Sequence, residues 1–158
     1  MNRDQFIALV KSEQESLRGF LLALCCGNRD DADDIAQDAL VKAYLACNEY
    51  SDRGKFRSWL FKIAHNTFLT HLSRLHVHDP IESVRSKLSQ DNADAVFEHQ
   101  DLYLALGSLP PKERSAIVLY YMNGYTIKEI TKITNTTEDA VKKQLSRGRI
   151  QLKTKLKI

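Results

Sequence analysis

Apolar residues recur along most of the chain at spacings of three and four positions, which is the period of an α-helix and not of a β-strand. In the first half this pattern predicts three helices, over about 4–25, 30–44 and 56–74. Gly27 and Asn28 separate the first two, and a loop over 48–55 separates the second from the third. No segment shows the clear alternation of apolar and polar residues that is typical of a strand.

The composition changes between the two halves of the chain. Residues 75–94 contain Pro80 and many Ser, Asp, Asn and His without an apolar period, and such a stretch is typical of a linker. Helical periodicity then resumes and predicts helices over about 97–106, 111–122, 127–133 and 138–152. We therefore expect an all-α fold of two small helical domains, over 1–75 and 97–158, joined by a flexible linker over 76–96.

Residues that favour helix ends lie where the last of these helices should begin and end. Gly124 suits a left-handed helix end, and Thr126 with a glutamate three residues later is a capping-box pattern. Thr137 can cap the final helix, and Asn135 lies where a turn needs a residue that tolerates left-handed backbone. Two short helices joined by such a turn predict a helix-turn-helix motif. Its predicted core residues are Ile130, Ile133 and Val141.

Charge is distributed unevenly along the sequence. The chain carries a net +3, yet residues 124–158 hold nine basic and three acidic residues, whereas residues 1–123 hold fourteen basic and seventeen acidic ones. A basic C-terminal end favours a polyanion such as nucleic acid, although a solvated basic helix has the same composition. Side chains that can pair with phosphates or read base edges gather on the exposed side of the final helix. They are Lys142, Lys143, Gln144, Ser146, Arg147 and Arg149.

Several other classes of protein do not fit the sequence. No apolar run approaches the roughly 20 residues needed to cross a bilayer, and the N-terminus does not resemble a signal peptide, so we expect a cytoplasmic protein without membrane insertion. An odd number of cysteines (Cys25, Cys26 and Cys47) argues against a disulfide framework or a zinc site. The five histidines lack an accompanying ligand set, and no phosphate loop or nucleophile motif is present. We expect neither an enzyme nor a metal or other cofactor.

Four segments together resemble regions 2 and 4 of extracytoplasmic-function (group 4) sigma factors of the sigma-70 family, and the resemblance covers nearly the whole chain. They are DDADDIAQD at 30–38, FRSWLFKIAHN at 56–66, LGSLPPKER at 106–114 and the stretch 124–149. The resemblance implies a region 2 helical bundle over 1–75 and a region 4 helix-turn-helix over 97–158. It also implies a transcription initiation factor that lends promoter recognition to RNA polymerase and has no catalysis of its own.

The resemblance assigns three tasks to the chain. Asp34, Gln37 and Asp38 resemble the residues that dock on a coiled coil of the largest polymerase subunit. A second set resembles the part that opens and binds the minus-ten element as single-stranded DNA: Tyr50, Arg53, Lys55, Phe56, Arg57, Phe61, Lys62 and Asn66. A third set would read the minus-thirty-five duplex: Thr137, Lys142, Lys143, Gln144, Ser146, Arg147 and Arg149. Trp59 stands apart, because its spacing with Leu60 and Ile63 favours a core position.

The implied partners are core RNA polymerase, through its largest and second-largest subunits, promoter DNA and an anti-sigma factor. The sequence departs from the family pattern at four positions. Thr131 replaces the usual alanine, Asn135 the usual glycine, Thr70 a common aspartate and His65 a common arginine. The alternative function is a helix-turn-helix regulator that binds DNA without joining polymerase. It accounts for the second half of the chain but not for the acidic and aromatic motifs of the first.

Overall fold

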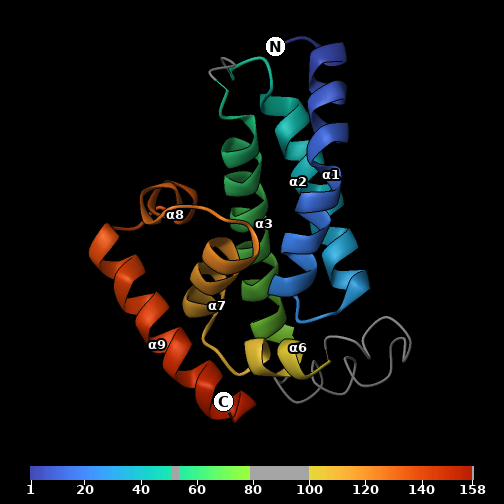
Figure 1. Cartoon of the computed structure of the whole chain (residues 1–158). Helices are drawn as coiled ribbons and strands as arrows, with labels where there is room; N and C mark the ends of the chain where they lie inside the picture. Colours follow the sequence, from blue (N-terminus) through green and yellow to red (C-terminus); the bar gives the residue numbers. More distant parts are fainter. Residues whose placement is uncertain (51–53, 79–99, 158) are drawn as a thin grey trace.

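Every regular element of the described chain is helical, as the sequence predicted. The computed structural model describes residues 1–50, 54–78 and 100–157, and Figure 1 shows how its helices are arranged. The expected linker falls almost entirely outside these residues. Its first three positions belong to the third helix, which continues to His78 and so exceeds the predicted end at about residue 74.

The first half is a bundle of three helices, α1 (Arg3–Leu24), α2 (Arg29–Ala46) and α3 (Phe56–His78), which lie side by side in Figure 1. Asn2 begins α1 through a capping box with Gln5, and Asn28 begins α2 by accepting a hydrogen bond from the Asp31 backbone N–H at 3.1 Å. Fully buried side chains from all three helices fill the centre. The largest are Leu17, Phe20, Leu21, Leu24, Ile35, Leu60 and Phe61.

The second half contains α6 (Gln100–Gly107), α7 (Pro111–Ile117), α8 (Ile127–Thr134) and α9 (Glu138–Leu156). Between α7 and α8 the chain winds more widely, as the π-helix η1 (Val118–Met122). The Asn123 backbone N–H donates to the Val118 carbonyl at 3.2 Å, five residues back. The sequence predicted one continuous α-helix here, and it predicted correctly that the helix ends at Gly124, whose φ is +72°.

The predicted helix-turn-helix is confirmed in α8 and α9. Thr126 accepts from the Glu129 backbone N–H at 3.2 Å, and the Glu129 side chain accepts from the Thr126 backbone N–H at 3.0 Å. Asn135 adopts left-handed backbone at φ 55°, ψ 51°, and Thr137 caps α9 by accepting from Ala140 at 3.2 Å. The side chains that join the two helices, Ile130, Ile133 and Val141, are at most 1% exposed.

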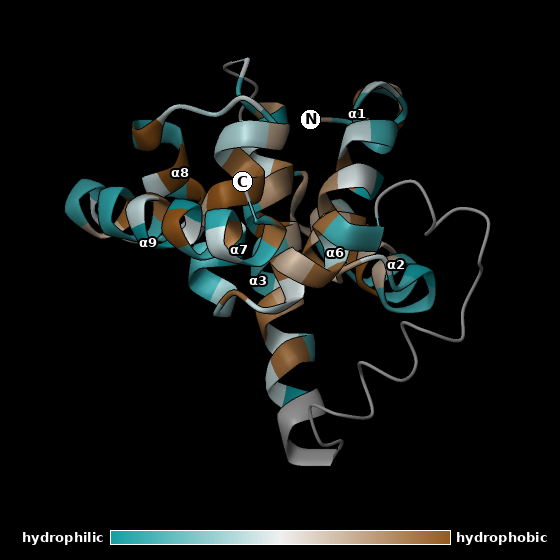
Figure 2. Cartoon of the chain, turned by 60° about the horizontal axis from the view of Figure 1, so that its bottom comes forward, coloured by the Kyte–Doolittle hydropathy of each residue, from teal (hydrophilic) through white to brown (hydrophobic). Residues whose placement is uncertain are grey.

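The two halves pack against each other. Helix α3 contacts α8, and α1 contacts α6, α7 and η1, so that the buried apolar residues of both halves form one continuous core. Arg114 joins the halves directly, because its Nη1 donates to the Leu24 carbonyl at the end of α1 at 2.9 Å. In Figure 2 α7 and α8 carry hydrophobic segments, whereas α9 is mainly hydrophilic. We call this packing of α8, η1 and α7 on α3 and α1 the closed arrangement.

Candidate nucleic-acid and partner interfaces

One side of α2 carries the acidic and amide side chains predicted to contact a partner. Asp34, Gln37 and Asp38 are all exposed, because Ile35 and Ala39 turn into the bundle on the opposite side. Helical geometry therefore separates the two sets as the sequence predicted. The three polar residues share one accessible surface, and whether they bind a partner stays a prediction.

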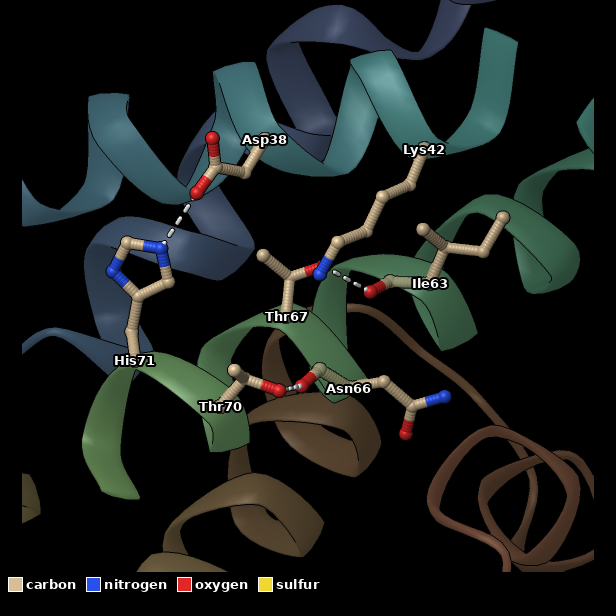
Figure 3. A network of polar contacts seen from close by, with 7 residues as sticks. All are labelled: Asp38, Lys42, Ile63, Asn66, Thr67, Thr70 and His71. Carbon is tan, nitrogen blue, oxygen red and sulfur yellow. Dashed lines mark hydrogen bonds and ion pairs between the residues drawn. The ribbon is translucent and has the colours of Figure 1, made fainter. Parts of the chain in front are cut away.

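A network of polar contacts connects this surface with α3 (Figure 3). The Asp38 carboxylate lies 2.8 Å from His71 Nε2, and Lys42 Nζ donates to Thr67 Oγ1 at 3.5 Å. Thr67 in turn donates to the Ile63 carbonyl at 2.7 Å. Asp38 is thus oriented by α3 while its side chain stays 53% exposed. A partner would meet a carboxylate that is already held in place.

Three exposed apolar side chains extend the same side of α2 toward its C-terminal end. Val41 is 60%, Tyr44 47% and Leu45 75% exposed. Asp34, Asp38, Val41 and Leu45 follow one another at spacings of four, three and four, which places them in a single row along the helix. The Tyr44 ring lies beside this row and contacts Phe6 edge-on at 5.7 Å. The spacing of Val41 and Leu45 from Asp34 and Asp38 is the sequence signal that could have predicted their place on this surface.

Aromatic rings gather where the 48–55 loop meets the start of α3. The ring of Tyr50 lies 4.7 Å from that of Trp59 and 6.0 Å from that of Phe56. Phe56 is only 4% exposed, whereas Tyr50 and Trp59 are half-buried. The packed position of Trp59 agrees with the core role that its spacing predicted. Arg53, another residue of the predicted minus-ten set, lies outside the described residues.

Two residues of the predicted minus-ten set contact the second half. Phe61 is completely buried, stacked on Phe20 at 4.8 Å and in edge contact with Tyr125 at 5.6 Å. The Arg57 guanidinium lies 5.4 Å from the Phe61 ring centre and 5.5 Å from that of Tyr125, and Arg57 Nε is 3.3 Å from Glu13. In the closed arrangement Phe61 presents no free face to DNA, whereas the Arg57 side chain is still 40% exposed.

Other members of the predicted minus-ten set remain accessible. Lys62 and Asn66 are exposed on α3, and Lys55 is exposed directly before it. The Asn66 side chain points away from the contacts that join α2 and α3, and only its backbone carbonyl is engaged, by the Thr70 hydroxyl at 3.0 Å (Figure 3). Thr70, which replaces a common aspartate, therefore forms a hydrogen bond within α3 and leaves the side-chain amide of Asn66 available.

His65 takes a role that the sequence did not reveal. Its ring is 3% exposed and faces α7, with Nε2 at 3.0 Å from Ser115 Oγ. Burial lowers the pKa of His65 to about 4, so the imidazole is neutral near pH 7. The arginine that is common at this position would carry a positive charge, whereas the His65 ring is neutral and buried. In place of that charge, His65 forms a contact between the two halves.

Helix α9 presents most of the predicted minus-thirty-five set to solvent. Thr137, Lys142, Lys143, Ser146 and Arg147 are exposed, and Gln144 is half-buried. Arg149 is exposed as well, and its guanidinium donates to the Tyr121 hydroxyl at 3.1 Å. Val141, Leu145 and Gly148 line the opposite, buried side of the helix. Five basic or hydroxyl-bearing side chains of the predicted set therefore lie on α9 beyond its cap, together with the amide of Gln144.

Comparison with known families assigns both halves. The model of Sigma-70 region 2 matches residues 9–76, and that of Sigma-70 region 4 matches residues 99–152. The chain belongs to the sigma-70 family. Curated relatives of this sigma factor include the ECF RNA polymerase sigma factor EcfG of Rhodopseudomonas palustris (strain TIE-1), 30% identical over 153 residues, which are 95% of this chain and 82% of the relative. The ECF sigma factor SigM of Bacillus subtilis (strain 168) is 32% identical over 127 residues, 77% of each chain.

Solved structures share the fold of the sigma factor over both halves. The sigma factor RpoE in complex with the anti-sigma factor NepR, from Bartonella quintana, has a TM-score of 0.78 at 24% identity and covers 98% of both chains. CnrH in complex with the cytosolic domain of CnrY has a TM-score of 0.72 at 26% identity, over 99% of this chain and 90% of that one. None of the helices described for the sigma factor is long and apolar enough to span a membrane.

Proposed function

We propose that this sigma factor joins core RNA polymerase through α2, holds the unpaired minus-ten element with the start of α3, and grips the minus-thirty-five duplex with α9. RNA synthesis then belongs to the polymerase, and the sigma factor contributes no catalytic group. It would act in the cytoplasm, where polymerase binds DNA. The observation that carries the proposal is the match of regions 2 and 4, in order, to two halves that expose an acidic row and a basic helix respectively.

Polymerase docking rests on the row along α2. Asp34 and Asp38 would meet basic residues of the largest subunit at the edge of the contact, where charge complementarity guides association. Val41 and Leu45 supply apolar area beside them, and exposed apolar area of this kind is typical of a protein contact. The contact of His71 with Asp38 keeps the carboxylate turned outward, which reduces the ordering that docking requires.

Binding of the minus-ten element rests on α3 and the aromatic cluster before it. Single-stranded DNA is held by cations along the backbone and by aromatic or apolar pockets for unstacked bases. Lys55 and Lys62 provide the cations, and Asn66 can make two hydrogen bonds to a base edge. Arg57 is partly accessible beside them, and Phe61 would join this surface only after the second half moves away.

Recognition of the upstream duplex rests on α9. Its N-terminal turns would enter the major groove, so that Lys143, Gln144 and Arg147 come nearest to base edges. The basic residues nearer its C-terminus would contact the phosphate backbone, which makes binding dependent on salt. An anti-sigma factor is a further proposed partner, because the similar RpoE of Bartonella quintana is bound to one.

In vitro transcription with purified core polymerase tests the proposal. The full chain should direct RNA synthesis from defined start points on genomic templates, and sequencing of the transcript ends identifies those points. The Asp38→Arg variant, which reverses the charge in the middle of the α2 row, provides the matched control and should give no specific transcripts. Failure of the intact, folded wild-type chain to promote any defined start would refute the proposed function.

A further inference from the structure

A buried histidine lies at the junction of the two halves in the closed arrangement. His65 Nε2 is 3.0 Å from Ser115 Oγ on α7, and both side chains are at most 3% exposed. The other ring nitrogen, Nδ1, is buried and has no hydrogen-bond partner among the described residues. A neutral imidazole has one N–H donor, whereas an imidazolium has two, and each buried N–H needs an acceptor. The closed arrangement therefore accommodates neutral His65 and not its protonated form.

The contacts around His65 cover part of the surface proposed to bind DNA. One turn before His65 on α3, Phe61 packs against Tyr125, and a further turn back Arg57 lies against the same tyrosine. Tyr125 belongs to the second half and is 6% exposed. Separation of α8 and α7 from α3 would thus expose Phe61 and His65 together, and would release the Arg57 guanidinium from Tyr125.

We propose that the His65–Ser115 contact is a proton-sensitive latch: proton uptake by His65 separates the two halves, uncovers Phe61 and releases Arg57 from Tyr125. The separation itself depends only on the contacts described above. The consequence for DNA binding rests on the proposed function, because it requires that the uncovered surface is the one that holds the minus-ten element.

Burial, and not a neighbouring charge, is the dominant influence on the pKa of His65. Charged or titratable side chains occur on every element packed against α3, and on α3 itself. They include Glu13, Arg18, Asp38, Lys42, Arg57, Lys62, His71, Lys112, Glu113, Arg114, Tyr125, Lys128, Glu129 and Lys132. Burial accounts for the lowered pKa of His65, and no charged group among the described residues contributes to that shift.

The direction of the pH effect follows from linkage. His65 has a pKa of about 4 in the closed arrangement and is expected to return to its ordinary value of 6.5 once exposed. The open state then binds the proton more tightly, so acid favours opening. The closed state keeps its full advantage above pH 6.5 and loses it as the pH falls toward 4. These values raise the opening constant about 25-fold between about pH 7.5 and about pH 5.

Small-angle X-ray scattering of the full chain between about pH 7.5 and about pH 5 tests the latch without polymerase or DNA. The radius of gyration of the wild type should increase as the pH falls. In the His65→Gln variant, which keeps a neutral hydrogen-bonding side chain, it should remain constant. The matched control is His71→Gln, one and a half turns further along α3, which should respond as the wild type does. Both variants retain the remaining histidines of the chain, so a response from those would persist in His65→Gln.

Opening of His65→Gln at the same pH as the wild type, or a wild type that stays compact at about pH 5, would overturn the proposal. If circular dichroism shows that His65→Gln does not fold, an NMR titration of the wild-type His65 ring decides instead. A ring that titrates at its ordinary value in the compact chain would overturn the latch. If opening occurs but binding of single-stranded DNA does not increase with it, the latch stands and the DNA-binding role of Phe61 and Arg57 is refuted.

Discussion

Replacing Gly148 by alanine should destabilise the second half, although alanine is normally the better residue inside a helix. Gly148 lies on the buried side of α9, where the helix packs against α7. A Cβ atom added there would lie 2.6 Å from Ile117 Cγ1 and 3.0 Å from its Cδ1. Ile117 is 4% exposed and closely surrounded, so it has little room to move aside.

Two opposing contributions set the size of the effect. Alanine gains about 0.5–1 kcal/mol over glycine from its helix propensity. Forcing an extra methyl group into a packed core typically costs about 1–3 kcal/mol. We expect a net loss of about 1–2 kcal/mol in the free energy of unfolding, or a fall in melting temperature of roughly 2–8 °C for a chain of this size. The recognition helix would also shift relative to α7.

Gly19 offers the matched control, because it lies inside α1 and a Cβ there meets nothing within 4 Å. Gly19→Ala should therefore stabilise the chain by about 0.5–1 kcal/mol. Urea unfolding of both variants, monitored by circular dichroism, shows whether the free energy of unfolding rises or falls in each. In an Ile117→Ala background the clash is relieved, and Gly148→Ala should become neutral or stabilising. Stabilisation by Gly148→Ala in the wild-type background would refute the steric argument.

Three further substitutions test the proposed surfaces and the contact between the halves. Arg147→Ala should weaken binding of upstream promoter duplex by about 1–3 kcal/mol in fluorescence anisotropy, and unchanged affinity would remove it from the site. Asp38→Arg should abolish capture by core polymerase while leaving the helical content intact, and normal holoenzyme assembly would discredit the α2 surface. Arg114→Met should lower stability in urea by about 3–5 kcal/mol, because three backbone carbonyls lose a charged donor. A loss below about 1 kcal/mol would contradict this.

Local signals in the sequence predicted most helices and the helix-turn-helix. Gly124, Thr126, Asn135 and Thr137 each act within a few residues, through backbone conformation or a hydrogen bond to a nearby N–H, and each adopts the expected geometry. The wide turn of η1 was missed because an apolar pattern does not distinguish α from π winding over five residues.

The packing of the two halves could not be predicted from the sequence. Phe61 combines an aromatic ring with basic neighbours, and this pattern predicts a base-binding surface and a buried contact equally well. His65 likewise gives no sequence signal of burial, because its partner Ser115 is fifty residues away in the chain. Only the arrangement in space decides which side chains of α3 face solvent. The proposed DNA contact of Phe61 therefore requires movement of the second half, whereas Arg57 is already partly exposed.

Arg114 affects how the chain unfolds. Its guanidinium binds the carbonyls of Leu106 and Leu109 within its own half and that of Leu24 in the other, at 2.9 to 3.1 Å. Fraying at the end of α1 therefore removes an acceptor from the second half, and melting of α7 removes a donor from the first. Two modules that could denature independently become one cooperative unit, with a single calorimetric transition while they are joined.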